Sequence, residues 1–355
     1  MRVLLVSSYP PRPCGIGAYA RDQVARLRDA GDDVTVLSPP DGDGEMLAPF
    51  LGGAAFRRAA AIGGRFERIV VQFQPALYFR PRAPLSKVAT SASLLWLAWR
   101  RGERLEVIVH EADPPARWRP DYLLLRMAFR AAGRLTFHTA AERAVFERSY
   151  RLRLRSRGTL VPHRVEATAS VAGVSRREAR RRLGIEWEGP TFVCAGFLQP
   201  SKGFDRALEA FARAFALDGG DQRNAVPPES RARLYLVGSV REDIPENRDH
   251  VEALRKRSLE VPAARLVERF LTDEEFDLWI AAADRVVLAY RRSWSSGVLA
   301  RAHAVGTPAI VTATGGLAEQ AEGNDVVVDG DDELAGAMRE AAERMGRTAG
   351  TRRTP

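Results

Sequence analysis

Short apolar runs alternate with longer segments of helical period along almost the whole chain. This alternation is typical of parallel sheets that are covered by crossover helices, and it predicts an α/β protein. At 355 residues the chain is too long for one small fold. We therefore expect two domains, each with its own core.

The two halves of the chain have similar patterns. In the first half we expect strands at 2–7, 34–38, 68–73, 105–110, 134–138 and 159–162, and helices at 16–29, 85–101, 120–132 and 140–150. In the second half we expect strands at 191–195, 234–237, 266–270, 285–289 and 309–311, and helices at 204–216, 248–258, 273–283, 297–305 and 332–345. The predicted organisation is a Rossmann-like domain at 1–164, a linker with a short helix at 165–190, a second Rossmann-like domain at 191–347 and a tail at 348–355. A polar, Gly- and Pro-containing segment at 217–231 predicts a surface insertion.

Composition excludes several classes of protein. Hydrophobic residues make up 45% and charged residues 28% of the chain, as in folded soluble proteins. No apolar run reaches the ~18 residues of a membrane span, and the apolar opening is too short for a signal peptide, so we expect a cytoplasmic protein. Cys14 and Cys194 lack the spacing of a disulfide framework or a zinc site. The net charge of +9 comes mainly from scattered arginines, which favours a solvated surface over nucleic-acid binding.

A glycine loop opens the first predicted helix. Gly15 and Gly17 belong to a G-x-G-x-x-A pattern that formally matches the dinucleotide fingerprint. The preceding loop is too long for that motif, however, and the second strand ends without the acid that would hold a ribose. What the pattern does indicate is a helix N-terminus whose backbone N–H groups can face a phosphate. A glycine loop that merely packs is the alternative.

Two segments of the second half lie where ligands of open α/β sheets bind. Lys202, one of three lysines in the chain, follows the first strand of that half and could complement a diphosphate as a point charge. The alternative is a helix-start residue that points to water. Further along, small residues form a loop before the helix at 297–305 and make a second anion-ready N-terminus; they are Ser293, Ser295, Ser296 and Gly297.

Taken together, these motifs resemble those of family 4 glycosyltransferases of GT-B fold. The resemblance rests on the Pro-Pro and Gly-x-Gly entry, the Val-Pro-His at 161–163, the segment 196–203 and the glycines at 306 and 315–316. The resemblance covers nearly the full chain and implies two Rossmann-like domains facing a central cleft. It implies that Lys202 meets the donor diphosphate, that Gly17 approaches it from the other domain, and that the backbone at Phe270 and Leu271 lies near the nucleobase. It also implies that His110 contacts the transferred sugar or orients the acceptor. A strand-end histidine with a purely structural role is the alternative.

The chain departs from the family pattern in the donor site. Phe197 stands where the family commonly has an arginine, and two family glutamates fall on Ser293 and Arg301. An arginine cannot accept hydrogen bonds from a ribose, so the site is either remodelled or inactive. We expect Arg301 to lean toward the loop before its helix and to bind phosphate, which would compensate for Phe197. The alternative is that Arg301 pairs with a carboxylate such as Glu319.

Two further patterns are less informative. Asp-Gly-Asp triplets at 41–43 and 329–331 lie in polar turns, where both residue types are favoured by the backbone, so we expect no metal site. The run 94–101 contains two tryptophans and is compatible with an interfacial membrane helix. A buried crossover helix is favoured, so membrane contact is not the preferred prediction.

The resemblance implies a retaining, metal-independent glycosyltransferase without a cofactor. It would move a sugar from a nucleotide-sugar donor to a small-molecule, glycan or lipid-linked acceptor. Three alternatives stay open: a catalytically silent glycosyltransferase-like binding partner, a nucleotide-sugar epimerase, and a dinucleotide oxidoreductase, which would explain only residues 15–20.

Overall fold

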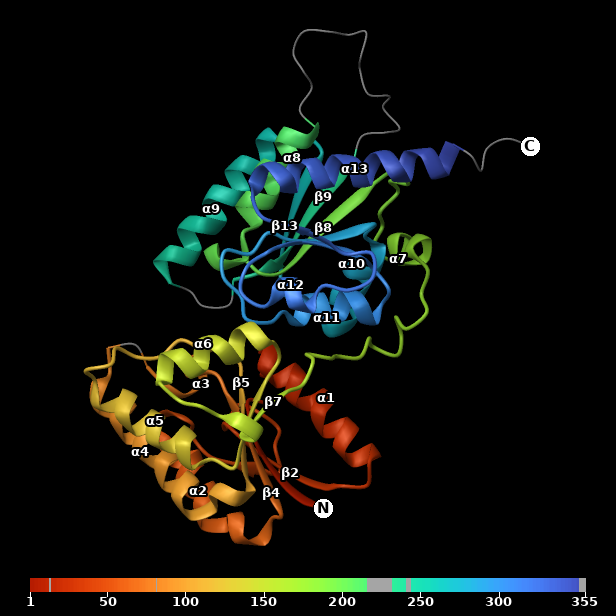
Figure 1. Ribbon diagram of the computed structural model, residues 1–355. Helices are drawn as coiled ribbons and strands as arrows, with labels where there is room; N and C mark the ends of the chain where they lie inside the picture. Colours follow the sequence, from red (N-terminus) through yellow and green to blue (C-terminus); the bar gives the residue numbers. More distant parts are fainter. Residues whose placement is uncertain (13, 81, 216–231, 241–243, 351–355) are drawn as a thin grey trace. The chain divides into compact units, whose positions relative to one another are not determined.

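The computed structural model describes residues 1–12, 14–80, 82–215, 232–240 and 244–350. The chain divides into two compact units, Met1–His163 and Arg164–Pro355, here called the first and second unit (Figure 1). The predicted insertion at 217–231 and the last five residues of the predicted tail lie outside the described residues.

The first unit contains a seven-stranded parallel sheet in the order β3-β2-β1-β4-β5-β6-β7. Its strands are β1 (Arg2–Val6), β2 (Asp33–Ser38), β3 (Met46–Leu47), β4 (Arg68–Phe73), β5 (Leu105–Val109), β6 (Arg134–Phe137) and β7 (Gly158–Leu160). The central strands are mainly apolar, with Gln72 and Glu106 as buried polar exceptions, and are buried on both faces because helices cover both sides of the sheet.

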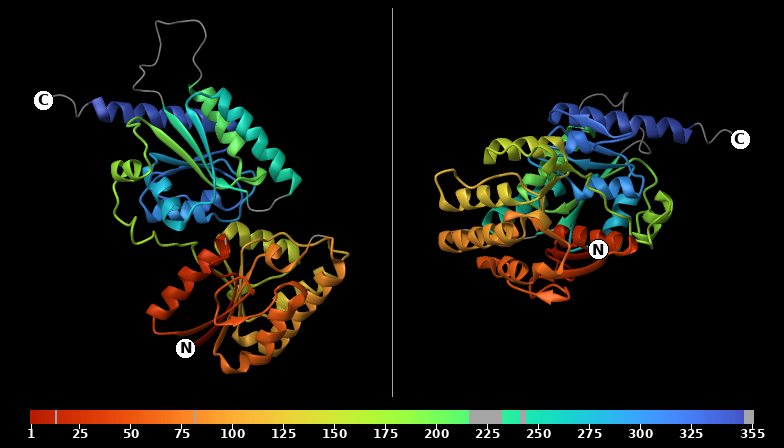
Figure 2. Two further views of the ribbon diagram at one scale, coloured as in Figure 1. Left: turned by 180° about the vertical axis from the view of Figure 1, so that it is seen from behind. Right: turned by 60° about the horizontal axis from the view of Figure 1, so that its bottom comes forward.

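The helices of the first unit form two layers. They are α1 (Gly15–Asp29), α2 (Ala54–Ile62), α3 (Pro75–Tyr78), α4 (Pro84–Arg101), α5 (Pro120–Ala131) and α6 (Ala140–Tyr150). Helices α2, α4 and α5 pack side by side, whereas α1 covers the opposite face of the sheet (Figures 1 and 2). Proline at the first position starts α4 and α5, and the Thr139 side chain caps α6.

The second unit contains a six-stranded parallel sheet in the order β10-β9-β8-β11-β12-β13. Its strands are β8 (Thr191–Phe197), β9 (Arg233–Ser239), β10 (Ala264–Glu268), β11 (Arg285–Leu288), β12 (Ala309–Thr312) and β13 (Val326–Val328). Its helices are α7 (Arg176–Arg182), α8 (Phe204–Phe215), α9 (Pro245–Glu260), α10 (Asp273–Ala282), α11 (Gly297–Ala304), α12 (Leu317–Gln320) and α13 (Asp331–Gly350).

The predicted linker is part of the second unit. Helix α7 packs against α10, and the Arg180 guanidinium donates to the Asp284 carboxylate at 2.7 Å. Five elements were not predicted: β3, β13, α3 and α12 are too short to show a strand or helix pattern, and α2 is a run of alanine and arginine with few large apolar residues. Among the described residues, no helix combines the length and apolar character needed to cross a bilayer.

Candidate functional site

Parallel strands end at one edge of their sheet, here called the carboxyl edge, and ligands of open α/β sheets bind there. Most of the residues singled out in the sequence lie at or just beyond the carboxyl edge of one of the two sheets. Each edge is described within its own unit.

Lys202 lies in a tight turn between β8 and α8. The next residue, Gly203, has φ 63°, and a Cβ atom there would lie 1.9 Å from the carbonyl oxygen of Ala289. Only glycine therefore lets this turn approach the end of β11 so closely. The Lys202 ammonium lies 4.0 Å from the centre of the Tyr290 ring, and it forms no ion pair among the described residues.

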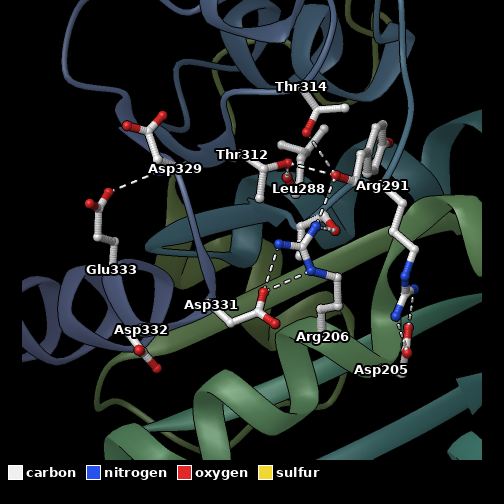
Figure 3. A network of polar contacts seen from close by, with 12 residues as sticks. Asp205, Arg206, Leu288, Arg291, Thr312, Thr314, Asp329, Asp331, Asp332 and Glu333 are labelled. Atoms are coloured by element: carbon white, nitrogen blue, oxygen red, sulfur yellow. Dashed lines mark hydrogen bonds and ion pairs between the residues drawn. The ribbon is translucent and has the colours of Figure 1, made fainter.

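Arg206 fixes the segment that carries Tyr290 (Figure 3). Its guanidinium donates to the Tyr290 carbonyl oxygen at 3.1 Å and is paired with the Asp331 carboxylate at 2.6 Å. The Thr312 and Thr314 hydroxyls donate to the same carbonyl oxygen, at 2.8 and 3.2 Å. The segment after β11 is thus held by three donors, one from α8 and two from the end of β12 and the loop that follows it. Asp331, from one of the two Asp-Gly-Asp triplets, belongs to this scaffold.

Arg291 joins the same segment to the lysine turn. It makes a two-pronged ion pair with Asp205, at 2.7 and 2.5 Å, and donates to the Pro200 carbonyl oxygen at 2.8 Å (Figure 3). Its backbone N–H donates to the carbonyl oxygen of Ser201 at 2.9 Å. The Arg291 charge is therefore neutralised, whereas the neighbouring Lys202 keeps its charge available for an anion.

The serine loop before α11 is organised by its own hydroxyl groups. The Ser293 hydroxyl donates to the Ser295 carbonyl oxygen at 2.8 Å, and the Ser296 hydroxyl accepts from the Leu299 N–H at 3.2 Å as the helix cap. The Gln320 side chain bonds both backbone groups of Ser296 at 2.8 Å. Gly297 is the first residue of α11. These contacts fix the loop, and the predicted donor-binding role of its residues stays a prediction.

Arg301 does not reach the serine loop as the sequence suggested. Its guanidinium donates to Asp277 on α10 at 2.6 Å and to Asp273 at 2.8 Å, and its side chain is only 9% exposed. Because two carboxylates already pair with it, the expectation that Arg301 leans toward the serine loop is wrong, and phosphate binding by Arg301 stays a prediction. The alternative of a carboxylate partner holds, although the partners are Asp277 and Asp273 rather than Glu319.

Phe270 and Leu271 follow β10 at the same edge. The Phe270 ring is 58% exposed, and the Leu271 side chain is buried in the core. A reciprocal capping box between Thr272 and Glu275 begins α10 directly after them. An aromatic ring next to water at a carboxyl edge offers a flat apolar surface, so the predicted nucleobase contact is sterically open at this position.

The carboxyl edge of the first unit gathers imidazoles. His110 follows β5, His138 follows β6 and His163 lies beyond β7, and all three rings contact the Tyr19 ring of α1. The His138 ring centre lies 5.2 Å from that of His110 and 4.6 Å from that of His163. We call these four residues the imidazole cluster.

The cluster is electrically neutral at neutral pH. Burial lowers the pKa of His138 to about 4, and burial together with the neighbouring imidazole His138 lowers the pKa values of His110 and His163 well below 6.5. Burial raises the pKa of Tyr19 to about 12, so its phenol stays protonated. The cluster therefore offers hydrogen bonds without charge.

Hydrogen bonds orient two of the rings. The Nδ1 atom of His138 lies 2.9 Å from the Val161 carbonyl oxygen, which can only accept, so this nitrogen carries the proton. The buried Nε2 atom of His138 is then an acceptor, and it has no partner among the described residues. His110 bonds the Gln72 side-chain oxygen at 2.5 Å through Nε2. A polar atom buried without a partner marks a place where a ligand can bind.

Gly15 and Gly17 lie in the first turn of α1. A Cβ atom on Gly17 would be 3.5 Å from backbone atoms of Ser8 and Tyr9, an ordinary contact, and one on Gly15 would meet nothing within 4 Å. Neither position is forced to be glycine by packing within the first unit. Their predicted phosphate contact stays a prediction.

Sequence reasoning gave a role in the site to His110 but not to His138 or Tyr19, and it used His163 only as part of the Val-Pro-His motif. A signal was available, because three successive strands of the first half are each followed within a few residues by a histidine. Carboxyl ends of neighbouring parallel strands lie together, so this repetition could have predicted the imidazole cluster.

The geometry agrees with comparisons to known proteins. Residues 189–344 match the family model described as Glycosyl transferases group 1. A D-inositol 3-phosphate glycosyltransferase from Nocardioides sp. is 33% identical over 152 residues, which are 40% of this chain and 31% of that protein. The chain thus spans about a third of the length of the curated relatives it matches.

Solved structures resemble the chain over almost its whole length. HepE of Anabaena, crystallised with UDP-glucose, aligns with a TM-score of 0.67 at 17% identity and covers 98% of this chain and 92% of its own. Sucrose-phosphate synthase of Thermosynechococcus elongatus aligns with a TM-score of 0.65 at 17% identity, covering 97% and 94%. These alignments confirm the predicted α/β class and GT-B fold.

Proposed function

We propose that this chain, whose residues 189–344 belong to the Glycosyl transferases group 1 family, is a glycosyltransferase that takes a sugar from a nucleotide-sugar donor. The observation that carries the proposal is the Lys202 ammonium at the end of β8. It is held over the Tyr290 ring at 4.0 Å, and no carboxylate among the described residues pairs with it. A preorganised cation of this kind stabilises the charge that develops on a departing diphosphate.

The arginines near Lys202 support the assignment of Lys202 as the diphosphate-binding cation, because they are paired with carboxylates and Lys202 is not. Arg206 and Arg291 are each paired with an aspartate and bonded to backbone carbonyl oxygens. They fix the positions of Tyr290 and the lysine turn, so that the ammonium is held in place before the donor binds. Phe270, exposed after β10, is the proposed contact for the nucleobase.

The imidazole cluster supports recognition of a sugar. Sugars present many hydroxyl groups and little charge, and the neutral rings of the cluster supply matching donors and acceptors. We assign His110 to the transferred sugar or to the acceptor hydroxyl. The relatives are named for transfer to an inositol phosphate, and the acceptor class proposed for this chain stays broader: a small molecule, a glycan or a lipid-linked sugar.

We further propose that transfer retains the anomeric configuration and needs no metal. The positive groups available for the diphosphate are Lys202 and the helix N-termini after Gly203 and Ser296. Turnover is therefore expected to survive EDTA. Loss of activity on chelation, restored by Mg²⁺, would contradict this part of the proposal.

One observation favours a second candidate, a catalytically silent binding partner. Arg301 occupies the place of an acidic family residue and is neutralised by Asp277 and Asp273, so it cannot accept hydrogen bonds from a ribose. A silent partner would still bind nucleotide-sugars but would not turn them over. Binding and turnover must therefore be measured separately.

Thermal unfolding in the presence of UDP-, GDP- and dTDP-sugars and of NAD(P)H tests the proposal. A ligand at 100 times its dissociation constant raises the free energy of unfolding by about 2.7 kcal/mol. Stabilisation by at least one nucleotide-sugar, followed by release of its nucleoside diphosphate, is the expected result. Stabilisation by NADH alone would show that the chain is not a glycosyltransferase.

A further inference from the structure

Helix α4 carries apolar residues on its outer side as well as on its inner side. Its exposed side is a stripe with a residue at every third or fourth position, formed by Leu85, Ala89, Ala92, the half-buried Trp96 and Trp99. Leu85 is 85% exposed and Trp99 77% exposed. A helix that covers a sheet in a water-soluble protein normally has its polar residues outside.

The inner side of α4 mixes hydroxyl groups with apolar side chains. Thr90, Ser91 and Ser93 are buried against the unit, and the hydroxyl groups of Thr90 and Ser91 have no hydrogen-bond partner among the described residues. Leu94, Leu97 and Ala98 are buried beside them, so α4 presents large apolar side chains to solvent in addition to those that it packs against the unit. Packing within the first unit does not account for the exposed tryptophan and leucine.

The neighbouring helix extends the exposed apolar surface. Leu123 and Met127, one turn apart on α5, are both more than half exposed, and Trp118 in the loop before α5 is 84% exposed. Helices α4 and α5 pack against each other on the same face of the sheet (Figure 1). We call this surface the α4–α5 face and define it by Leu85, Trp96, Trp99, Trp118, Leu123 and Met127.

Positive charge is concentrated in the chain segment that forms the α4–α5 face. Residues 79–131 contain ten arginines and lysines but only five acidic residues, so they supply more than half of the net charge of +9. Two of those acids, Glu106 and Asp121, are buried and paired with arginines. The exposed arginines Arg80, Arg82 and Arg100 lie at the two ends of α4.

We propose that the α4–α5 face binds the surface of an anionic lipid bilayer. Tryptophan and leucine enter the boundary between headgroups and acyl chains, and arginines at the rim attract anionic headgroups. The inner side of α4 stays packed on the sheet, so the helix lies on the membrane. A second copy of this chain is a poor occupant, because pairing two such faces would bring like charges together.

This proposal is independent of the proposed transferase activity, and sedimentation with vesicles tests it. The full chain is mixed with vesicles of phosphatidylcholine, with or without phosphatidylglycerol. We expect binding to the vesicles that contain phosphatidylglycerol, weaker binding without it, and loss of binding at high salt because salt screens the arginines. Equal binding to both kinds of vesicle, or none to either, would overturn the proposal.

Two double variants test whether the α4–α5 face is the surface that binds the vesicles. The double variant Trp99→Ser with Trp118→Ser is expected to bind anionic vesicles about tenfold or more weakly, because interfacial tryptophans are lost. The matched control is Leu259→Ser on α9, where the leucine is 83% exposed in the second unit; it should bind as wild type. A second variant, Arg82→Glu with Arg100→Glu, tests charge without touching the tryptophans and should lose the preference for phosphatidylglycerol.

Three results would contradict the assignment. If both double variants bind anionic vesicles as wild type does, the surface lies elsewhere. If Leu259→Ser weakens binding equally, the effect is not specific to the α4–α5 face. If sedimentation equilibrium shows a dimer that both double variants dissociate, the face is an interface between copies of the chain.

Discussion

The carboxyl edges of the two units differ in charge: one carries neutral side chains and the other carries charged ones. The edge of the first unit gathers three neutral imidazoles around a tyrosine, and burial keeps all of them uncharged. The edge of the second unit is rich in charge, but its arginines are paired with aspartates, as for Arg206 and Arg291. There, Lys202 keeps its charge unpaired among the described residues.

The difference fits a division of work between the two units under the proposed function. A diphosphate needs positive charge at one defined point, and paired arginines provide rigidity around such a point without adding net charge. A sugar needs many directional hydrogen bonds and little charge, which neutral imidazoles supply. The comparison predicts that charge-changing substitutions act mainly through the second unit and that pH acts mainly through the first.

The largest effect is expected at Asp277. Its carboxylate is fully buried and accepts from Arg301 at 2.6 Å and from the Thr168 backbone N–H at 2.8 Å. Asp277→Ala leaves the buried guanidinium with Asp273 as its remaining partner, and we expect a loss of about 3–5 kcal/mol in unfolding free energy. Chemical denaturation measures it.

The control for Asp277 is Asp332→Ala. The Asp332 side chain is 96% exposed and pairs with Arg213, so its loss should change the unfolding free energy by less than about 1 kcal/mol. If Asp277→Ala were as mild as this control, the charged network of the second unit would not be a structural element.

A smaller effect is expected at His110. His110→Ala removes the hydrogen bond to Gln72 and a proposed contact to the sugar, and we expect turnover to fall about tenfold while the fold stays intact. His303→Ala, in the second unit, where the ring pairs with Asp325 at 2.7 Å, is the control that should leave turnover unchanged. Unchanged turnover in His110→Ala would assign that histidine a structural role.

A pH trend in stability is expected at Glu142 on α6. Burial raises its pKa to about 8 from the ordinary 4.5. The folded chain therefore keeps a proton that the unfolded chain loses, and stability falls as the pH rises from 4.5 to about 8. Glu142→Gln should remove this loss of stability. Its melting temperature relative to that of wild type should therefore increase as the pH rises through that range. A difference in melting temperature between variant and wild type that stays constant over this pH range would contradict the assignment of the trend to Glu142.

His138 gives a pH dependence of stability with the opposite sign in the same unit. Its pKa of about 4 lies below the ordinary 6.5. Between these two pH values the unfolded chain binds a proton at His138 that the folded chain does not bind. Stability should fall as the pH drops from 6.5 to about 4, and His138→Gln should weaken that dependence. Melting curves of both variants over the same pH series separate the two trends.

Most of the fold could be predicted because buried parallel strands are short apolar runs. The site was harder, since it depends on contacts between distant residues. Lys202 was recognisable from its place after a strand, but Arg301 was not, because its partner Asp277 lies 24 residues away on another helix. The orientation of α4 was also hidden: the run 94–101 shows that a helix forms, but only the structure shows that Trp99 faces outward.

Titration calorimetry with Lys202→Ala tests the central claim most directly. Wild type and variant are titrated with the nucleotide-sugar that stabilises the chain best, with its nucleoside diphosphate and with the bare nucleoside. We predict that the variant loses about tenfold or more in affinity for the two diphosphate ligands, as expected for the loss of a charge-assisted contact. Affinity for the nucleoside should not change. Equal affinities of wild type and variant for the diphosphate ligands would contradict the claim that Lys202 is the diphosphate-binding cation of the second unit.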